Sequence, residues 1–244
     1  MDVDMAMTST IDGVEGWFSP LDQVLFTWLL RRQGDEPPGD LVELGVYLGK
    51  SAILMGRHLR PGDRFTVCDL FEIPAQDDGN REECEGTYPG LLRSAFEKNY
   101  LRFHETLPLI VQGHTRTVLE HVRGGTCRFA HVDASHLYEH VSQDVDSVQA
   151  MLRPTGVAVF DDFRAEHTPG TAAAVWEAVL RKGLRPICFT RNKFYGTWGD
   201  PEPARASLIE WLAGQTGIHW DRHRIAEHRL IRLWVTHRQN TSHW

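Results

Sequence analysis

The sequence has few cysteines and lacks the pattern that would pair them. Its 244 residues include four, Cys68, Cys84, Cys127 and Cys188, and no two of them form a C-x-x-C motif. Three of the four lie in apolar runs that are typical of strands. This distribution indicates buried thiols in a reducing cytosol.

Positive charge and long apolar runs are also scarce. Lysine and arginine number 26 against 33 aspartate and glutamate residues, which gives a net charge of -7, and the basic residues are scattered. A nucleic-acid backbone or an anionic membrane would require a clustered positive surface, so we expect neither as a partner. No apolar run approaches the length of a membrane span, and MDVDMAMTST lacks a positive region followed by an apolar core. We therefore expect a soluble, cytoplasmic protein.

A third absence concerns nucleotide-binding loops. No G-x-G-x-x-G motif follows a strand-like run, which argues against a dinucleotide-dependent oxidoreductase. The stretch ELGVYLGKSA, residues 43–52, ends like the phosphate-binding loop G-x-x-x-x-G-K-[ST], but only three residues separate Gly45 from Gly49. Glu43 would also repel phosphates. A P-loop-like ATP-binding protein is an alternative that both features oppose.

What the sequence does contain is a regular alternation of strand-like and helical segments. With 41% hydrophobic and 24% charged residues, it can fill one α/β domain. We predict a Rossmann-like sheet of seven mostly parallel strands, with helices on both faces and the last strand antiparallel. The predicted strands are residues 41–46, 64–70, 107–112, 127–132, 156–160, 185–198 and 230–235.

Residues 1–244 are predicted to form this single domain with additions. Residues 1–34 comprise a loose arm, to about residue 16, and a helix that Ser19 caps and that packs on the domain through an apolar stripe. Segments 71–104 and 195–228 exceed ordinary loop lengths. We predict that they are lids or walls of a substrate pocket, with surface decoration or a dimer contact as the alternative.

Ligands of an open parallel sheet bind outside the carboxyl ends of its strands, so the residues that follow each strand are the candidate site. After the first strand, Gly45 and Gly49 let a ligand approach the backbone, and Glu43 suits the ammonium group of a bound amino acid. Asp69 ends the second strand, where a carboxylate can accept the hydroxyls of a ribose. Gly113-His114 follows the third strand and is a place for an adenine ring.

The fourth and fifth strands end in acidic motifs, HVDASH and VFDDF. Asp133, Asp161 and Asp162 should converge at one edge of the sheet, where three carboxylates require a cation or protons to neutralise them. An all-oxygen site suits Mg²⁺. His136, three residues past Asp133, is placed to act as a general base.

Together these motifs resemble one family. The chain resembles class I S-adenosylmethionine-dependent methyltransferases, in the branch that includes metal-dependent O-methyltransferases of macrolide sugars and other natural products. The resemblance runs in order through GWFSPLDQVLF, VELGVYLGKS, TVCDLFE, HVDASHLYEHVSQD, LRPTG, VFDDF and HTPGTAAAVWEAV, about two-thirds of the chain.

The resemblance implies the roles of individual residues. It assigns His136 and Asp133 to catalysis and Asp133, Asp161 and Asp162 to the metal. It assigns to S-adenosylmethionine the residues Glu43, Gly45, Tyr47, Gly49, Ser51, Asp69, Gly113, His114 and Asp133. Relatives often have an acid where this chain has His114, and some use an acid where it has Ser135. The implied reaction is Mg²⁺-dependent methylation of a hydroxyl on a small molecule, such as a sugar or a natural-product intermediate.

Two other function classes stay open at this point. His136 to His140 reads H-x-x-E-H, the pattern of a zinc hydrolase of the inverted zincin type. The fold could also serve as a binding or scaffold subunit without activity, although the intact acids and glycines oppose this. A homodimer with the N-terminal helix at its interface is a further expectation.

Overall fold

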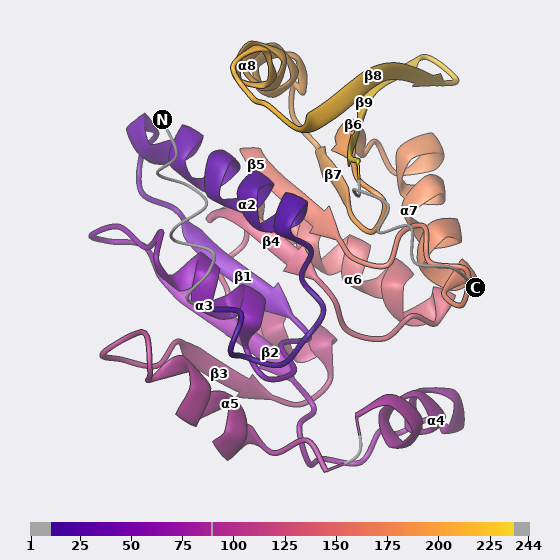
Figure 1. Ribbon diagram of the computed structural model, residues 1–244. Coiled ribbons are helices and arrows are strands. Elements are labelled where there is room, and N and C mark those ends of the chain that lie inside the picture. Colours follow the sequence, from indigo (N-terminus) through magenta and orange to yellow (C-terminus); the bar gives the residue numbers. More distant parts are fainter. Residues whose placement is uncertain (1–10, 89, 237–244) are drawn as a thin grey trace, which may run out of the picture.

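The computed structural model describes residues 11–88 and 90–236, which form one nine-stranded sheet with helices on both faces (Figure 1). The strand order is β3-β2-β1-β4-β5-β7-β6-β9-β8. The strands are β1 (Asp40–Leu44), β2 (Phe65–Asp69), β3 (Leu109–Gln112), β4 (Cys127–Val132), β5 (Leu152–Phe160), β6 (Arg185–Phe189), β7 (Phe194–Thr197), β8 (Ile218–Ile225) and β9 (His228–Val235). The predicted α/β class is thus confirmed.

The first five strands are all parallel, and their burial follows the sequence. β4 has the pattern of a strand covered on both faces, since all six of its residues are buried. Cys68, Cys127 and Cys188 lie buried in β2, β4 and β6 as free thiols, as their apolar surroundings in the sequence predict.

Helices cover the sheet from both sides. They are α2 (Pro20–Arg32), α3 (Lys50–Gly56), α4 (Asp78–Thr87), α5 (Arg93–Tyr100), α6 (Tyr138–Met151), α7 (Pro169–Arg181) and α8 (Glu202–Ala213), with short 3-10 turns η1 (Gln33–Asp35) and η2 (Thr115–Glu120). One hydrophobic cluster joins α2, α3, α5 and α8 to one face of the sheet. A second cluster joins α6 and α7 to the opposite face.

The predicted N-terminal helix is confirmed as α2. The Ser19 side chain accepts a hydrogen bond from the Asp22 backbone N–H at 3.1 Å, and Pro20 occupies the first turn, where its missing N–H costs nothing. Leu25 and Leu29 are buried against the sheet. The expected loose arm is wrong for residues 11–16, because Ile11 and Val14 belong to the same core, while residues 1–10 lie outside the described part of the chain.

The sheet has more strands than the seven predicted. Residues 185–198 form the antiparallel hairpin β6–β7 instead of one extended strand, and β7 lies between β5 and β6. The predicted last strand is β9, which pairs in parallel with β6 and antiparallel with the edge strand β8. The antiparallel strands in this part of the sheet are β7 and β8, whereas the predicted last strand, β9, runs parallel to β6.

The two long segments have structure of their own. Segment 71–104 contains α4 and α5, and segment 195–228 contains most of β7, α8 and β8. In Figure 1, α4 lies at the lower right, apart from the helices that cover the sheet. Among the described residues, no helix combines the length and the apolar character that crossing a membrane requires.

Asp144 on α6 is a buried carboxylate, and the nearby Thr115 side chain offsets only part of the cost of burying its charge. Burial raises its pKa to about 7. A raised folded-state pKa means that stability is present at low pH and is lost as pH rises from about 4 to 7. We expect Asp144→Asn to raise the free energy of unfolding by about 2 to 4 kcal/mol at pH 8, with little gain at pH 4, because the amide carries no charge to bury. Urea denaturation of both proteins across this range measures the difference; a gain that does not grow with pH would contradict it.

Candidate active site

The site is built on three strands that end in register. Leu44, Val132 and Phe160 are lateral neighbours at the carboxyl ends of β1, β4 and β5. The ladder continues for one more residue, since the Asp133 N–H donates to the Leu44 carbonyl at 2.8 Å and the Asp161 N–H to the Val132 carbonyl at 2.9 Å. The predicted acids therefore stand beside the loop that follows β1.

That loop needs both of its glycines. Gly45 has φ of +78°, and a Cβ atom there would lie 2.0 Å from the Asp133 carbonyl oxygen. Gly49 has φ of +91°, and a Cβ there would meet the Phe96 ring at 2.9 Å. Only glycine combines this left-handed backbone with so close a contact. The loop is therefore pressed against the carboxyl end of β4.

Asp69 fixes the same loop from the other side. Its Oδ2 accepts the N–H groups of Val46 at 2.7 Å and Tyr47 at 3.1 Å, and its Oδ1 accepts the Phe71 N–H at 2.9 Å. Burial raises the pKa of Asp69, and these backbone donors oppose the rise. The carboxylate thus holds the loop in shape, and ribose binding by Asp69 stays a prediction.

Glu43 is fully buried and takes part in a chain of polar contacts. Its Oε1 accepts the Ser51 hydroxyl at 2.5 Å and lies 2.7 Å from His131 Nδ1. His131 is the lateral neighbour of Glu43 on β4, and its Nε2 lies 3.0 Å from Lys193 Nζ. A lysine ammonium only donates, so Nε2 accepts and Nδ1 carries the hydrogen that is donated to Glu43.

The second carboxylate oxygen of Glu43 remains available to a ligand. Oε2 is buried and has no hydrogen-bond partner among the described residues. Burial raises the pKa of Glu43 to about 8. A donor carried by a ligand would satisfy Oε2, and the ammonium group of the methionine part of S-adenosylmethionine fits this requirement.

Lys193 is a buried cation that sequence reasoning missed. It precedes β7, is 1% exposed, and forms an ion pair with Asp161 Oδ2. Burial lowers its pKa, but the nearby Asp161, Asp133 and Asp22 carboxylates more than offset this and raise it, so the ammonium stays charged. Asp161 therefore already has a positive partner.

Three carboxylates converge as predicted, but they divide between two groups of potential metal ligands. Asp133 belongs to both: one group adds His131 and Asp161, the other His136 and Asp162, and within each group the ligand atoms lie within 4.8 Å of one another. Burial, then the neighbouring Asp161, raises the pKa of Asp133 well above its usual range. Asp162 has φ of +49°, a conformation that turns it away from the direction of β5.

His136 lies between two carboxylates that come from different elements. Its Nε2 is 3.0 Å from Asp162 Oδ2, and its Nδ1 is 3.3 Å from Glu83 Oε1 on α4. Burial lowers the pKa of His136, but its ion pairs with Asp162 and Glu83 outweigh burial and raise the pKa to about 10. The ring is therefore an imidazolium in this arrangement.

The expected adenine position is only partly defined. The Gly113 N–H donates to the Asp69 carbonyl at 2.9 Å, which brings the end of β3 to the site. His114 Nε2 is buried without a hydrogen-bond partner among the described residues, and burial lowers the pKa of the ring. A neutral imidazole with a free nitrogen is compatible with contact to a base, but its role stays a prediction.

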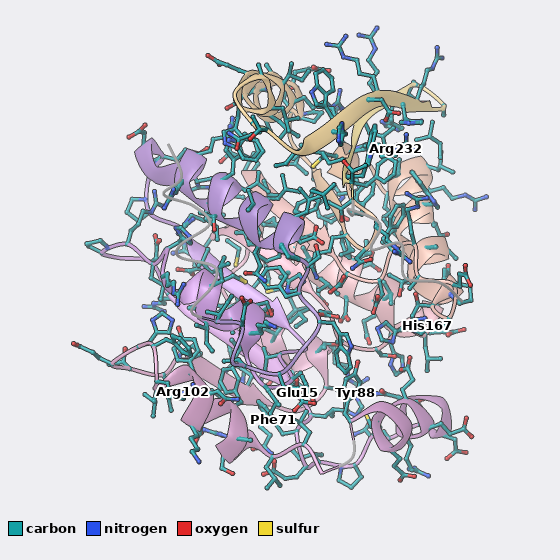
Figure 2. All side chains as sticks on the ribbon, viewed as in Figure 1. Glu15, Phe71, Tyr88, Arg102, His167 and Arg232 are labelled. Atoms are coloured by element: carbon teal, nitrogen blue, oxygen red, sulfur yellow. The ribbon has the colours of Figure 1, made fainter. Side chains whose placement is uncertain are left out.

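An aromatic pocket of about 440 Å³ borders the glycine loop. Trp17 stacks on Tyr47 with ring centroids 5.5 Å apart, and Tyr88 lies 5.4 Å from Tyr47. Figure 2 shows Glu15 and Tyr88 close together at this edge, and both line the pocket. The phenol of Tyr88 also lies near Asp133 and Asp162, whose charges add to burial in raising its pKa. The pocket therefore adjoins the acidic cluster.

The comparison with known families agrees with this geometry. Residues 42–163, half of the chain, match the family described as "Methyltransferase domain". The chain belongs to this family. It is a class I S-adenosylmethionine-dependent methyltransferase, as its sequence motifs predict. No curated protein sequence matches the chain significantly.

Solved structures of other methyltransferases share the fold. The O-methyltransferase NovP is 19% identical over 73% of this chain and 79% of its own, with a TM-score of 0.59. CalS11, a TDP-rhamnose 3'-O-methyltransferase of calicheamicin biosynthesis, is 18% identical over 75% and 82%, with a TM-score of 0.51. An O-methyltransferase from Bacillus cereus in complex with SAH is 13% identical over 79% and 88%, also with a TM-score of 0.51.

The structure does not assemble a zinc-hydrolase site from the H-x-x-E-H segment. His136 contacts Glu83 and Asp162, whereas His140 pairs with Asp77 at 3.1 Å. Neither potential metal group among the described residues contains both histidines. An inverted zincin requires both imidazoles on one ion, so this alternative has no structural support.

Proposed function

We propose that this methyltransferase is an O-methyltransferase that acts on a hydroxyl of a small molecule, such as a sugar or a natural-product intermediate, with the help of Mg²⁺. The observation that supports this best is the placement of Asp133, Asp162 and His136 beside the glycine loop. The printed names of NovP and CalS11 describe O-methyltransferases, and CalS11 acts on a sugar. We further propose that the protein works in the cytoplasm; the homodimer stays a prediction.

Different residues of the site would hold different parts of S-adenosylmethionine, the methyl donor. Glu43, through its unpartnered Oε2, would bind the amino acid end of S-adenosylmethionine. The backbone of the loop from Gly45 to Gly49 would approach the methionine chain without steric hindrance. When bound, the cofactor would supply a methyl group on a sulfonium ion, and the C–S electron pair would leave with sulfur as the acceptor oxygen bonds to the methyl carbon.

Of the two groups of potential metal ligands, only the one formed by Asp133, His136 and Asp162 is suited to a divalent cation. Asp133 and Asp162 offer carboxylate oxygens close to each other and to His136, as a hard cation prefers. Asp161 is engaged by Lys193, so we assign it a supporting position in place of direct ligation. Bound Mg²⁺ would neutralise the carboxylates and acidify an acceptor hydroxyl.

His136 is the proposed base. To accept the hydroxyl proton at Nε2 the ring must first be neutral, and its present charge derives largely from Asp162 and Glu83. Neutralising Asp162 with bound Mg²⁺ would remove part of the stabilisation of the imidazolium. Nε2, which faces the Asp162 and Asp133 carboxylates, would then be free to accept the proton. The base and the metal ligands are therefore expected to function as a unit.

The test combines binding with methyl transfer. Calorimetry should show binding of S-adenosylmethionine but not of ATP or NAD. Mass spectrometry should detect a methylated product when methyl-labelled cofactor meets a panel of sugars, nucleotide sugars, phenols and catechols with Mg²⁺, and less product with EDTA. His136→Asn should lower the rate about 10²- to 10⁴-fold. His223→Asn is the matched control, since His223 on β8 also pairs with a carboxylate, that of Asp221, but belongs to neither group of potential metal ligands among the described residues. A full rate in His136→Asn, or no binding of the cofactor, would end the proposal.

A further inference from the structure

Helix α4 lies against the turn between β4 and α6 through polar contacts. Glu83 Oε2 accepts the Ser135 hydroxyl at 2.6 Å, and Glu83 Oε1 accepts the His136 backbone N–H at 2.9 Å. Asp77, which caps the start of α4, pairs with His140. This short helix and its cap thus contact two residues of the turn that carries the proposed base and one residue of α6.

Apolar packing contributes little to this placement. Of the α4 residues with described side chains, none belongs to either hydrophobic cluster, and only Asn80 is buried. Segments with few buried apolar contacts open at low free-energy cost. The contacts of Glu83 and Asp77 are therefore a large share of what keeps α4 over the site.

The contact between Glu83 and His136 also has a defined direction. Glu83 lies at Nδ1 and Asp162 at Nε2, so the two carboxylates approach the ring from opposite ends. The side chains of His136 and Glu83 are 17% and 22% exposed, so solvent screens their interaction only in part. Without Glu83 the ring would lose the partner that fixes which nitrogen is directed at Asp162 and Asp133.

We propose that Glu83 is a positioning residue for His136, so that the base has its working orientation only while α4 lies against the β4–α6 turn. The inference rests on the proposed function, in which His136 is the base. It assigns to segment 71–104 a direct part in assembling the site, beside its predicted role as a lid or pocket wall. Glu83 itself does not exchange a proton with the acceptor.

Two substitutions separate the charge of Glu83 from its docking contacts. Glu83→Gln keeps an oxygen and an amide for the His136 N–H and the Ser135 hydroxyl, but removes the charge that faces Nδ1. Ser135→Ala is the matched control, because it removes one α4 contact and leaves the pair with His136 intact. Asp77→Asn is a second control that weakens docking at the other end of α4.

The first readout needs neither cofactor nor acceptor. In ¹⁵N spectra of histidine-labelled protein at pH 7.5, with the His136 signal assigned from His136→Asn, Nδ1 should shift in Glu83→Gln and keep its position in both controls. Hydrogen exchange of α4 should match the wild type in Glu83→Gln, which would show that the helix is still docked. An unchanged Nδ1 signal in Glu83→Gln overturns the inference.

The second readout is kinetic and uses an acceptor found in the panel above. We expect Glu83→Gln to lower kcat about 10- to 100-fold with KM for S-adenosylmethionine changed less than about twofold, as for groups that orient a reacting side chain. An equal fall in Ser135→Ala would reduce Glu83 to a docking contact and overturn the positioning role. If no acceptor is methylated while Nδ1 shifts as expected, the proposed function fails and the orienting contact stands.

Discussion

Replacing Lys193 with methionine is expected to lower the free energy of unfolding by about 3 to 5 kcal/mol, the usual cost of removing one partner of a buried ion pair. Methionine matches the length of the lysine stem but leaves Asp161 without its cation and His131 Nε2 without its donor. Asp133 and Asp22, which also interact with the ammonium, would lose that favourable interaction. Urea denaturation at neutral pH measures the loss.

Two further variants show whether the cost arises from burial. Lys182→Met removes a lysine whose pair with Asp146 has side chains 24% and 61% exposed, and it should cost less than about 1 kcal/mol. The double substitution Lys193→Met with Asp161→Asn removes both charges and should recover part of the stability. Equal losses for Lys193→Met and Lys182→Met would show that Lys193 does not neutralise the acids.

Gly45→Ala is expected to weaken binding of S-adenosylmethionine at least about 100-fold, since displacing a binding loop by about 1 Å can cost that much. The new methyl group would lie 2.0 Å from the Asp133 carbonyl oxygen, which is backbone and cannot turn aside. The loop, the end of β4 or both must therefore shift. Calorimetric titration with the cofactor measures the change in affinity.

Gly125→Ala isolates the backbone contribution to this effect. Gly125 has φ of +71°, close to the +78° of Gly45, but a Cβ there would meet nothing within 4 Å. The left-handed backbone alone should cost about 1 to 2 kcal/mol of stability and leave cofactor affinity unchanged. If Gly45→Ala behaves like Gly125→Ala, the close approach of the loop to β4 does not determine binding.

The parts of the fold that the sequence predicts well are those that depend on local pattern. The cap at Ser19 and the buried strand 127–132 each follow from a few neighbouring residues and are as predicted, whereas α2 is buried over more than its predicted apolar stripe, since Phe26 and Leu30 are buried as well. The acids Asp133 and Asp161 could be placed side by side because parallel strands bring their carboxyl ends to one edge.

Features that depend on distant pairing were missed. Residues 185–198 read as one strand because both halves are apolar, and only the pairing of β7 with β5 separates them into a hairpin. Lys193 and Glu83 are ordinary charged residues in their local sequence. Their importance comes from tertiary contacts, with Asp161 and with His136, that span 32 and 53 positions.

The tethered ammonium of Lys193 changes what a chelation experiment means. EDTA extracts an ion that can diffuse away, but it cannot extract a positive group that the polypeptide itself carries between Asp161 and His131. The carboxylates would thus keep one neutralising neighbour after chelation, and the protein should stay folded. A drop in turnover under those conditions would then report on chemistry instead of on collapse of the structure.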